Sequence, residues 1–234
     1  PILYEEITQK VAAQVPVGEG PDLVAPFYGW VPLWLQGGFL APLPEDAFPP
    51  SELHDQFVPA MDAIRIDGRY YGIPTSVDVY ALYYNKDYFA EAGISEPPKT
   101  WEELRETAIK LTKFDENGKM TRSGYFIWFE QSEHIIWKLA LEQWGQPQFD
   151  AESRHVLWNA SETGYEAFEW FMNLIRKDKI SDLGFADSAS LAFQQGLSAM
   201  GISTTSWITR IQDANPDLNY GIAPWICGPA EDEV

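Results

Sequence analysis

Residues 79–111, VYALYYNKDYFAEAGISEPPKTWEELRETAIKL, carry the clearest secondary-structure signals in the chain. The first seven are rich in aromatic and apolar residues, which is typical of a strand. After Pro97 and Pro98, Thr100 is a natural helix N-cap, and Glu103 three residues later completes a capping box. An apolar stripe at helical spacing then follows, formed by Trp101, Leu104, Ala108 and Leu111. A strand followed by an amphipathic helix indicates an α/β fold.

The segments on either side of this stretch continue the alternation of helices and strands. Residues 3–14 have apolar residues at helical spacing, and a Gly-Pro turn leads to a short apolar run at 22–25 that predicts a buried strand. Residues 64–74 predict a β-hairpin around Asp67-Gly68. Further strands are expected at 124–129, 198–203 and 220–223, and further helices at 133–144, 161–177 and 187–195. The sequence therefore predicts an α/β protein with mixed sheets.

The composition is that of a globular protein with an acidic surface. Of the 234 residues, 45% are hydrophobic and 22% are charged, and the formal net charge is −19. Such a surface repels phosphate backbones and anionic lipid headgroups, so nucleic acid is not expected as a partner. No apolar run approaches the ~20 residues that span a bilayer. Cys227 is the only cysteine, so no disulfide can form within the chain.

Aromatic residues are abundant, and the common catalytic motifs are missing. The chain has 10 Trp, 11 Tyr and 13 Phe, and several of them stand beside Gly, Pro or Ser in expected loops. The sequence contains no Gly-x-Ser-x-Gly elbow, P-loop or dinucleotide fingerprint. His54, His134 and His155 are scattered without the spacing of metal ligands. We therefore expect neither a metal nor a cofactor.

Six short motifs, taken together, resemble a known family. In chain order they are GPDLV at 20–24, GFLAPL at 38–43, DGRYYGIP at 67–74, ALYYNKD at 81–87, PPKTWEEL at 97–104, and FQQG at 193–196 followed by Ala199-Met200 and Trp207. Their order and spacing over nearly the whole chain resemble the family 1 extracellular solute-binding proteins of ABC importers, the maltose-binding-protein-like group.

This resemblance implies a two-lobe periplasmic-binding-protein-like fold of type II. Mixed sheets flanked by helices form each lobe, and the ligand lies in a cleft between the lobes, which close over it by hinge motion. Lobe one is expected at 1–77 plus 224–234 and lobe two at 80–222, with hinge crossings near 74–80 and 223–228. Compared with the family, the chain is expected to be truncated at both ends. The leader, the first strand and first helix of lobe one, and the C-terminal segments of both lobes are expected to be missing.

The resemblance also implies a function without chemistry. The expected activity is extracytoplasmic binding of a sugar or polyol, in the periplasm or as a cell-surface lipoprotein, and its delivery to the membrane permease of an ABC transporter. A monomer is expected. The alternative from another class is a glycoside hydrolase that uses a carboxylate pair on an aromatic-lined cleft, although no catalytic pair stands out.

Two residues are the first candidates for ligand contact. Asp78 interrupts a β-prone run, where an unpaired carboxylate would be costly, and it aligns with a ligand-binding acid of the family. Trp207 follows the polar stretch 203–206, whose hydroxyls could donate hydrogen bonds, and it matches the stacking tryptophan of the family. The alternatives are an exposed or turn-capping acid near the hinge for Asp78, and a core tryptophan for Trp207.

The remaining candidates lie in three segments. One pair follows the strand expected at 22–25, another group follows the strand expected at 124–129, and one residue stands at the return crossing. In that order they are Tyr28 and Trp30; Trp128, Gln131, Glu133 and His134; and Trp225. The alternatives are helix packing for the first pair, a solvated helix start for the second group and hinge packing for Trp225. The candidates include two carboxylates, Asp78 and Glu133, and no Lys or Arg, which favours a neutral ligand, with a cationic ligand second.

Overall fold

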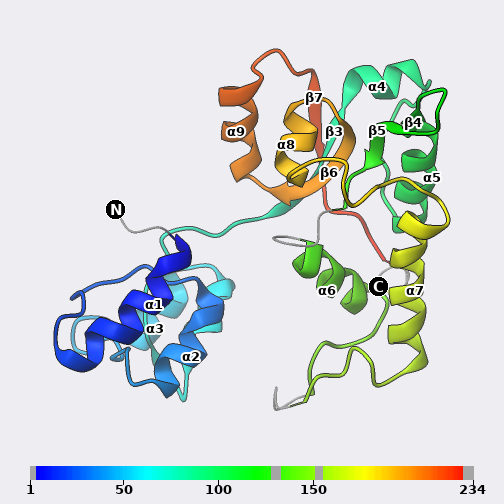
Figure 1. Ribbon diagram of the computed structural model, residues 1–234. Coiled ribbons are helices and arrows are strands. Elements are labelled where there is room, and N and C mark those ends of the chain that lie inside the picture. The colour runs from blue at the N-terminus through cyan, green and yellow to red at the C-terminus, as the bar shows by residue number, and fades with distance from the viewer. Residues whose placement is uncertain (1–3, 128–132, 151–154, 229–234) are drawn as a thin grey trace. The chain divides into compact units, whose positions relative to one another are not determined.

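The structure is a computed structural model, and it describes residues 4–127, 133–150 and 155–228 (Figure 1). The chain divides into two compact units, Pro1–Val77 and Asp78–Val234. No helix within the described residues is long and apolar enough to cross a membrane.

The first unit is mostly helical. Its elements are the helices α1 (Tyr4–Gln14), α2 (Val31–Gln36) and α3 (Pro50–Gln56), the 3-10 helices η1 (Val15–Val17), η2 (Tyr28–Trp30) and η3 (Pro59–Ile64), and the strands β1 (Arg65–Ile66) and β2 (Arg69–Tyr70). The helix expected at 3–14 is confirmed by α1.

The two strands of this unit form the expected hairpin. Its turn residues, Asp67 and Gly68, both have positive φ angles, of 50° and 79°. Two-residue hairpin turns favour this conformation, and glycine adopts it without strain. Tyr70 lies in β2 and joins Leu53 and Met61 in the buried cluster of the unit. The hairpin therefore supplies part of a small core.

The strand predicted at 22–25 is wrong. This segment has no regular secondary structure, and the side chain of Leu23 is 91% exposed. A strand needs a neighbour to pair its backbone N–H and C=O groups. Within the described part of the first unit, β1 and β2 pair only with each other, so these four residues have no ladder to join.

The second unit is built on a five-stranded sheet with the order β4-β5-β6-β3-β7. β3 is antiparallel to both of its neighbours, while β5 is parallel to β6, so the sheet is mixed as expected. The strands are β3 (Tyr80–Asn85), β4 (Lys113–Phe114), β5 (Met120–Tyr125), β6 (Ser198–Thr204) and β7 (Tyr220–Ala223).

The helices of the second unit follow the sequence signals closely. They are α4 (Lys86–Glu91), α5 (Trp101–Leu111), α6 (Glu133–Gln143), α7 (Glu162–Arg176), α8 (Ala189–Gln194) and α9 (Ser206–Ala214). The expected N-cap is present, because Thr100 Oγ1 accepts the N–H of Glu103 at 3.2 Å. The Glu103 carboxylate in turn accepts the N–H of Lys99 at 2.7 Å, one residue before the cap.

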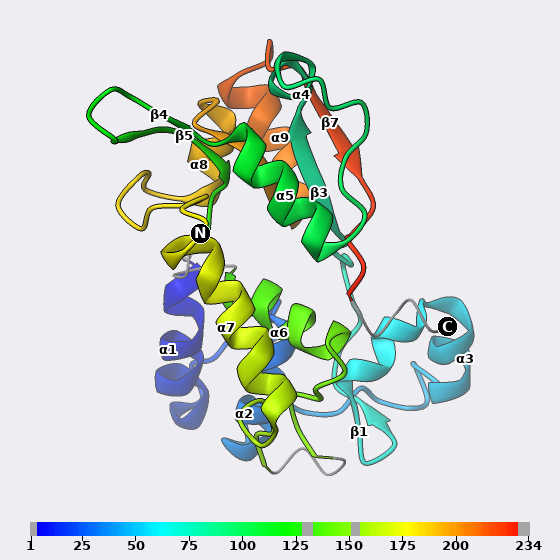
Figure 2. The ribbon, with the colours of Figure 1, turned by 90° about the vertical axis from the view of Figure 1, so that its right-hand side faces the viewer.

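Helices cover both faces of this sheet, as Figure 1 and Figure 2 show. Leu82 of β3 belongs to a buried cluster with side chains of α5, α6 and α7. Its neighbour Tyr83 points to the other face and packs with side chains of α8 and α9. Alternation along a strand places successive side chains on opposite faces, so a strand buried on both faces is apolar throughout.

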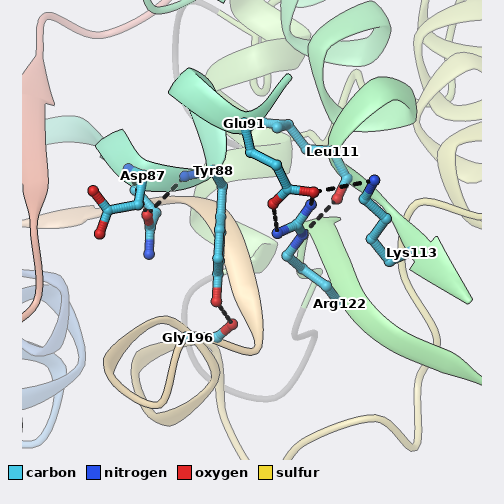
Figure 3. A network of polar contacts seen from close by, with 8 residues as sticks. Asp87, Tyr88, Glu91, Leu111, Lys113, Arg122 and Gly196 are labelled. Atoms are coloured by element: carbon cyan, nitrogen blue, oxygen red, sulfur yellow. Dashed lines mark hydrogen bonds and ion pairs between the residues drawn. The ribbon is translucent and has the colours of Figure 1, made fainter. Parts of the chain in front are cut away.

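A polar network ties α4 to the start of β5 (Figure 3). The Arg122 guanidinium donates to the Leu111 carbonyl at 2.9 Å and to the Glu91 carboxylate at 2.8 and 3.3 Å. It also lies 4.0 Å from the ring centroid of Tyr88, and Lys113 approaches Glu91 at 3.2 Å. The hydrogen bond from Arg122, supported by Lys113, lowers the pKa of the Glu91 carboxyl to about 2. Glu91 is therefore an anion at neutral pH.

Candidate functional site

Several predicted site residues belong to segments that meet at one end of the sheet in the second unit. Tyr80, the first residue of β3, pairs with Thr204, the last residue of β6. β7 also ends here, because its last residue, Ala223, pairs with Leu82. β5 runs parallel to β6 and finishes in the same direction. We call this the Thr204 end of the sheet, made by residues 78–80, 126–127, 204–207 and 223–225.

Asp78 lies two residues before β3 at the Thr204 end. It is exposed, and no hydrogen bond or ion pair of its carboxylate is found within the described residues. A solvated carboxylate without a partner retains its full capacity to accept hydrogen bonds. Both sequence readings, a ligand-binding acid and an exposed acid near the hinge, fit this environment.

Trp207 lies in the first turn of α9, but its indole points into the core. The side chain is 4% exposed and stacks on Phe193 at 5.6 Å between ring centroids. It also contacts the Tyr83 ring at 5.3 Å. Gly201 of β6 makes room for the indole, since a Cβ there would lie 2.7 Å from it. These contacts favour the packing alternative over ligand stacking.

Hydroxyl groups rather than the indole are exposed next to this helix start. Thr204 Oγ1 and Ser206 Oγ lie 2.8 Å apart and share a hydrogen bond. Beneath them the Tyr83 hydroxyl donates to the Thr204 carbonyl at 2.9 Å. Burial raises the pKa of Tyr83 to about 12, so it remains a neutral donor that fixes the end of β6. The sequence pointed to the polar stretch 203–206, but not to which of its hydroxyls are exposed.

Trp225 follows β7 and packs against aromatic rings of its own unit. Its ring centroid lies 5.9 Å from that of Tyr80, with the planes at 81°. A second edge-on contact, at 6.1 Å and 79°, joins it to Trp101. Trp225 is partly buried by these contacts, which correspond to the hinge-packing alternative.

The candidates after β5 fall largely outside the described residues. Phe126 and Ile127 are buried, and Trp128 and Gln131, which come next, are not described. Glu133 and His134 form the start of α6, but the description does not extend to their side chains. Their roles stay predictions.

The two candidates of the first unit lie in η2. Tyr28 begins this 3-10 helix, and its side chain is not among those described. Trp30 ends it and packs against Phe27 at 6.1 Å and against Trp34 at 5.8 Å between ring centroids. The expected position of the pair after a strand is not realised, although the ring contacts of Trp30 agree with the helix-packing alternative.

The chemistry at the Thr204 end suits hydrogen bonding to a neutral guest. The residues that make this end include an aspartate, hydroxyls and aromatic rings, but no lysine or arginine. Within the described chain, no group of three or more His, Cys, Asp or Glu side chains could hold a metal ion. The residues described at this end can accept and donate hydrogen bonds.

A pocket that the sequence did not predict lies on the same unit. Its volume is about 310 Å³, and its lining residues are Thr100, Trp101, Glu102, Trp144, Trp170, Cys227 and Gly228. The Trp144 and Trp170 rings pack against each other at 5.1 Å. No sequence signal marked these residues as a group, because they lie at the start of α5, just after α6, on α7 and in the segment after β7.

The fold places the chain among solute-binding proteins. A solved structure of an ABC transporter solute-binding protein from Thermotoga lettingae, bound with α-D-tagatose, superposes with a TM-score of 0.79. It shares 26% sequence identity and covers 97% of this chain and 59% of its own.

The family follows from the sequence. A profile described as bacterial extracellular solute-binding protein matches residues 1–231, and the chain belongs to this family. The resemblance inferred from the six motifs is thereby confirmed, and the hydrolase alternative is set aside because the family consists of binding proteins rather than enzymes.

Two curated relatives show the range within the family. The maltotriose-binding protein of Pyrococcus abyssi is 27% identical over 227 residues, 95% of this chain and 46% of the relative. The sn-glycerol-3-phosphate-binding periplasmic protein of Escherichia coli is 27% identical over 172 residues, 71% of this chain and 39% of the relative. The chain thus spans about half, or less, of the length of these relatives.

Proposed function

We propose that this chain captures a neutral sugar or polyol outside the cytoplasm and delivers it to the membrane permease of an ABC transporter. Residues 1–77 would belong to one lobe and 80–222 to the other, and the lobes would close around the ligand as a monomer. The protein would work in the periplasm or as a cell-surface lipoprotein.

The observation that carries this proposal is the set of groups at the Thr204 end of the sheet. Asp78 offers a free carboxylate, and Thr204 and Ser206 offer hydroxyls, all from segments that start or finish at this end. In open α/β sheets, ligands bind beyond the ends of strands. A carboxylate that accepts a hydrogen bond from a sugar hydroxyl contributes about 1.5–3 kcal/mol.

The comparisons support the same ligand class. The relative from Pyrococcus abyssi is named for maltotriose, and the structure from Thermotoga lettingae holds tagatose. Both are uncharged sugars, which fits a site that combines an acid with hydroxyls.

A glycerol phosphate is the second candidate, because the Escherichia coli relative is named for one. A phosphate group calls for arginine or lysine, which pair with its oxygens. The residues at the Thr204 end include neither, and Asp78 would repel an anion. The neutral ligand is therefore favoured.

A binding screen tests the proposal on the natural gene product that contains this chain. Thermal shift followed by calorimetry would compare mono-, di- and trisaccharides, polyols and sn-glycerol 3-phosphate. We expect at least one neutral compound to raise the melting temperature without being consumed. Stabilisation by sn-glycerol 3-phosphate alone would select the second candidate, and hydrolysis products would contradict both.

Asp78→Asn tests the assigned group. We expect about 10- to 100-fold weaker binding of the stabilising sugar, since the amide replaces a charged acceptor with a neutral one. Asp213→Asn, at an exposed position on α9, is the matched control and should bind as the wild type does. Equal affinities for all three proteins would refute the role of Asp78.

A further inference from the structure

We infer that Trp225 is a positioning residue of the hinge: it clamps the segment after β7 to the start of β3, so that in the first connection between the lobes bending is confined to residues 74–79. This inference rests on the proposed closure of two lobes. It assigns Trp225 a role through other residues of the protein rather than through contact with the sugar.

The clamp begins where the ladder between β3 and β7 stops. Leu82 pairs with Ala223, and Pro224 follows, which has no N–H to donate. Tyr80 lies two residues before Leu82, and Trp225 lies two residues after Ala223. Their rings meet edge to face, with 5.9 Å between the ring centroids. Such aromatic pairs contribute about 0.5–1.5 kcal/mol beyond the area they bury. A side-chain contact thus continues the pairing that the backbone has to end.

Trp225 is anchored in turn on the core of the second unit. It contacts Trp101, which is 2% exposed and belongs to the cluster beneath α5, α6 and α7. Trp101 Nε1 donates to Gln143 Oε1 at 2.7 Å, and Gln143 Nε2 donates to the Ile226 carbonyl at 2.9 Å. These contacts link α5, α6 and residues 225–226 to one another. Moving Trp225 would therefore disturb two buried hydrogen bonds.

The next residues are held to the same unit. The N–H of Cys227 donates to the Lys99 carbonyl at 2.7 Å, in a parallel bridge with Thr100. Gly228 packs so closely that a Cβ there would lie 2.3 Å from the Cβ of Gln143. The return segment is therefore fixed to the second unit as far as residue 228.

The other connecting segment has none of these attachments. Residues 75–79 are exposed and form no helix or strand, and within the described chain no hydrogen bond to them is found. Val77 and Val79 expose 51% and 63% of their surface. Hinges are short segments that can absorb changes in φ and ψ, and few contacts oppose such changes here. Residue 80, clamped by Trp225, marks the stiff end of this segment.

The test measures the hinge directly. Spin labels at Ala13→Cys on α1 and Lys110→Cys on α5, in a Cys227→Ser background, report the distance between the two units by pulsed dipolar spectroscopy. We expect Trp225→Ala to broaden the ligand-free distance distribution and Trp225→Phe to restore it, because phenylalanine keeps an aromatic contact. Trp158→Ala, which removes a partly exposed tryptophan elsewhere on the second unit, should leave the distribution unchanged.

Affinities separate a hinge role from a stacking role. If Trp225 acts through the hinge, Trp225→Ala lowers the affinity for every sugar by the same factor, about 10-fold, because the substitution affects lobe closure rather than a contact with the ligand. A loss that differs between sugars, with an unchanged distance distribution, would show that the indole touches the ligand and would overturn the inference.

A second variant keeps the test decisive if Trp225→Ala folds poorly. Tyr80→Ala removes the same ring contact from the other side, and it should also broaden the ligand-free distance distribution. The double variant with Trp225→Ala should show no broadening beyond that of either single variant. A narrow distribution for Tyr80→Ala would refute the clamp. The ligand-free measurement does not depend on sugar binding, so a failure of the proposed function would be recognised separately.

Discussion

The two units of the chain are stabilised in different ways. The second unit has a five-stranded sheet with a buried cluster on each face. Within its described residues, the first unit has a two-stranded hairpin and a buried cluster formed by Leu53, Met61 and Tyr70. Leu23 of this unit exposes 91% of its surface, more than any large apolar side chain described in the second unit. A sheet that is covered on both sides buries apolar surface far more completely than short helices around a hairpin.

The same substitution in each core gives the largest expected contrast. Leu104→Ala on α5 removes a side chain with no exposed surface from the larger cluster, and we expect a loss of about 4 kcal/mol in the free energy of unfolding. Leu53→Ala in the first unit should cost only about 2 kcal/mol, because a cluster of few buried side chains relaxes more easily around a cavity.

Chemical denaturation, followed by circular dichroism, measures both losses. Two transitions, each shifted by only one of the variants, would show that the units unfold separately. Equal losses for the two leucines would contradict the difference between the cores.

A pair of glycines gives a contrast of intermediate size. A Cβ at Gly124 of β5 would lie 2.0 Å from the Ala108 carbonyl, so α5 packs directly on the strand. We expect Gly124→Ala to cost about 2–3 kcal/mol, because the backbone on both sides must shift. Gly72 of the first unit has only a contact at 3.7 Å, and Gly72→Ala should change stability by less than ~1 kcal/mol. If Gly124→Ala leaves the melting temperature unchanged in thermal unfolding, the close packing of α5 on β5 would be contradicted.

The contrast between the units also explains which parts of the fold the sequence predicted. The Thr100 cap, the Asp67-Gly68 turn and the strand at 79–85 depend on neighbours within a few residues, and each was predicted correctly. The strand expected at 22–25 depends on a partner strand elsewhere in the chain, and local sequence cannot supply that information. Its failure falls in the unit with the least sheet.

The candidate site shows the same division. The sequence predicted where these tryptophans lie along the chain, since Trp207 does follow a small-residue strand and Trp225 does follow β7. The sequence did not predict which way their indoles point, because these directions depend on contacts with Gly201, Phe193 and Trp101, which lie elsewhere in the sequence. Periodicity assigns a residue to an element, but packing across the sheet decides which way its side chain points.

The smallest expected effect is electrostatic and compares one carboxylate in each unit. The hydrogen bond from Arg122 lowers the pKa of Glu91, and the hydrogen bond from Tyr70, at 2.5 Å, lowers that of Asp62. A carboxyl group with a lowered pKa stabilises the folded state above its ordinary pKa, and this contribution is lost as the pH falls. For Glu91 the loss runs from about 4.5 down to about 2.

We therefore expect Glu91→Gln to lower the melting temperature slightly at pH 7, because Glu91 is partly exposed and solvent screens its ion pairs. The difference from the wild type should shrink as the pH falls from 4.5 toward 2, where the wild-type carboxyl becomes protonated as well. Glu106→Gln, at an exposed position on α5, is the control and should follow the wild-type curve. Tyr70→Phe applies the same test to the first unit by removing the donor to Asp62. A difference for Glu91→Gln that stays constant between pH 7 and pH 2 would mean that the Arg122 network stabilises the second unit through packing rather than through charge.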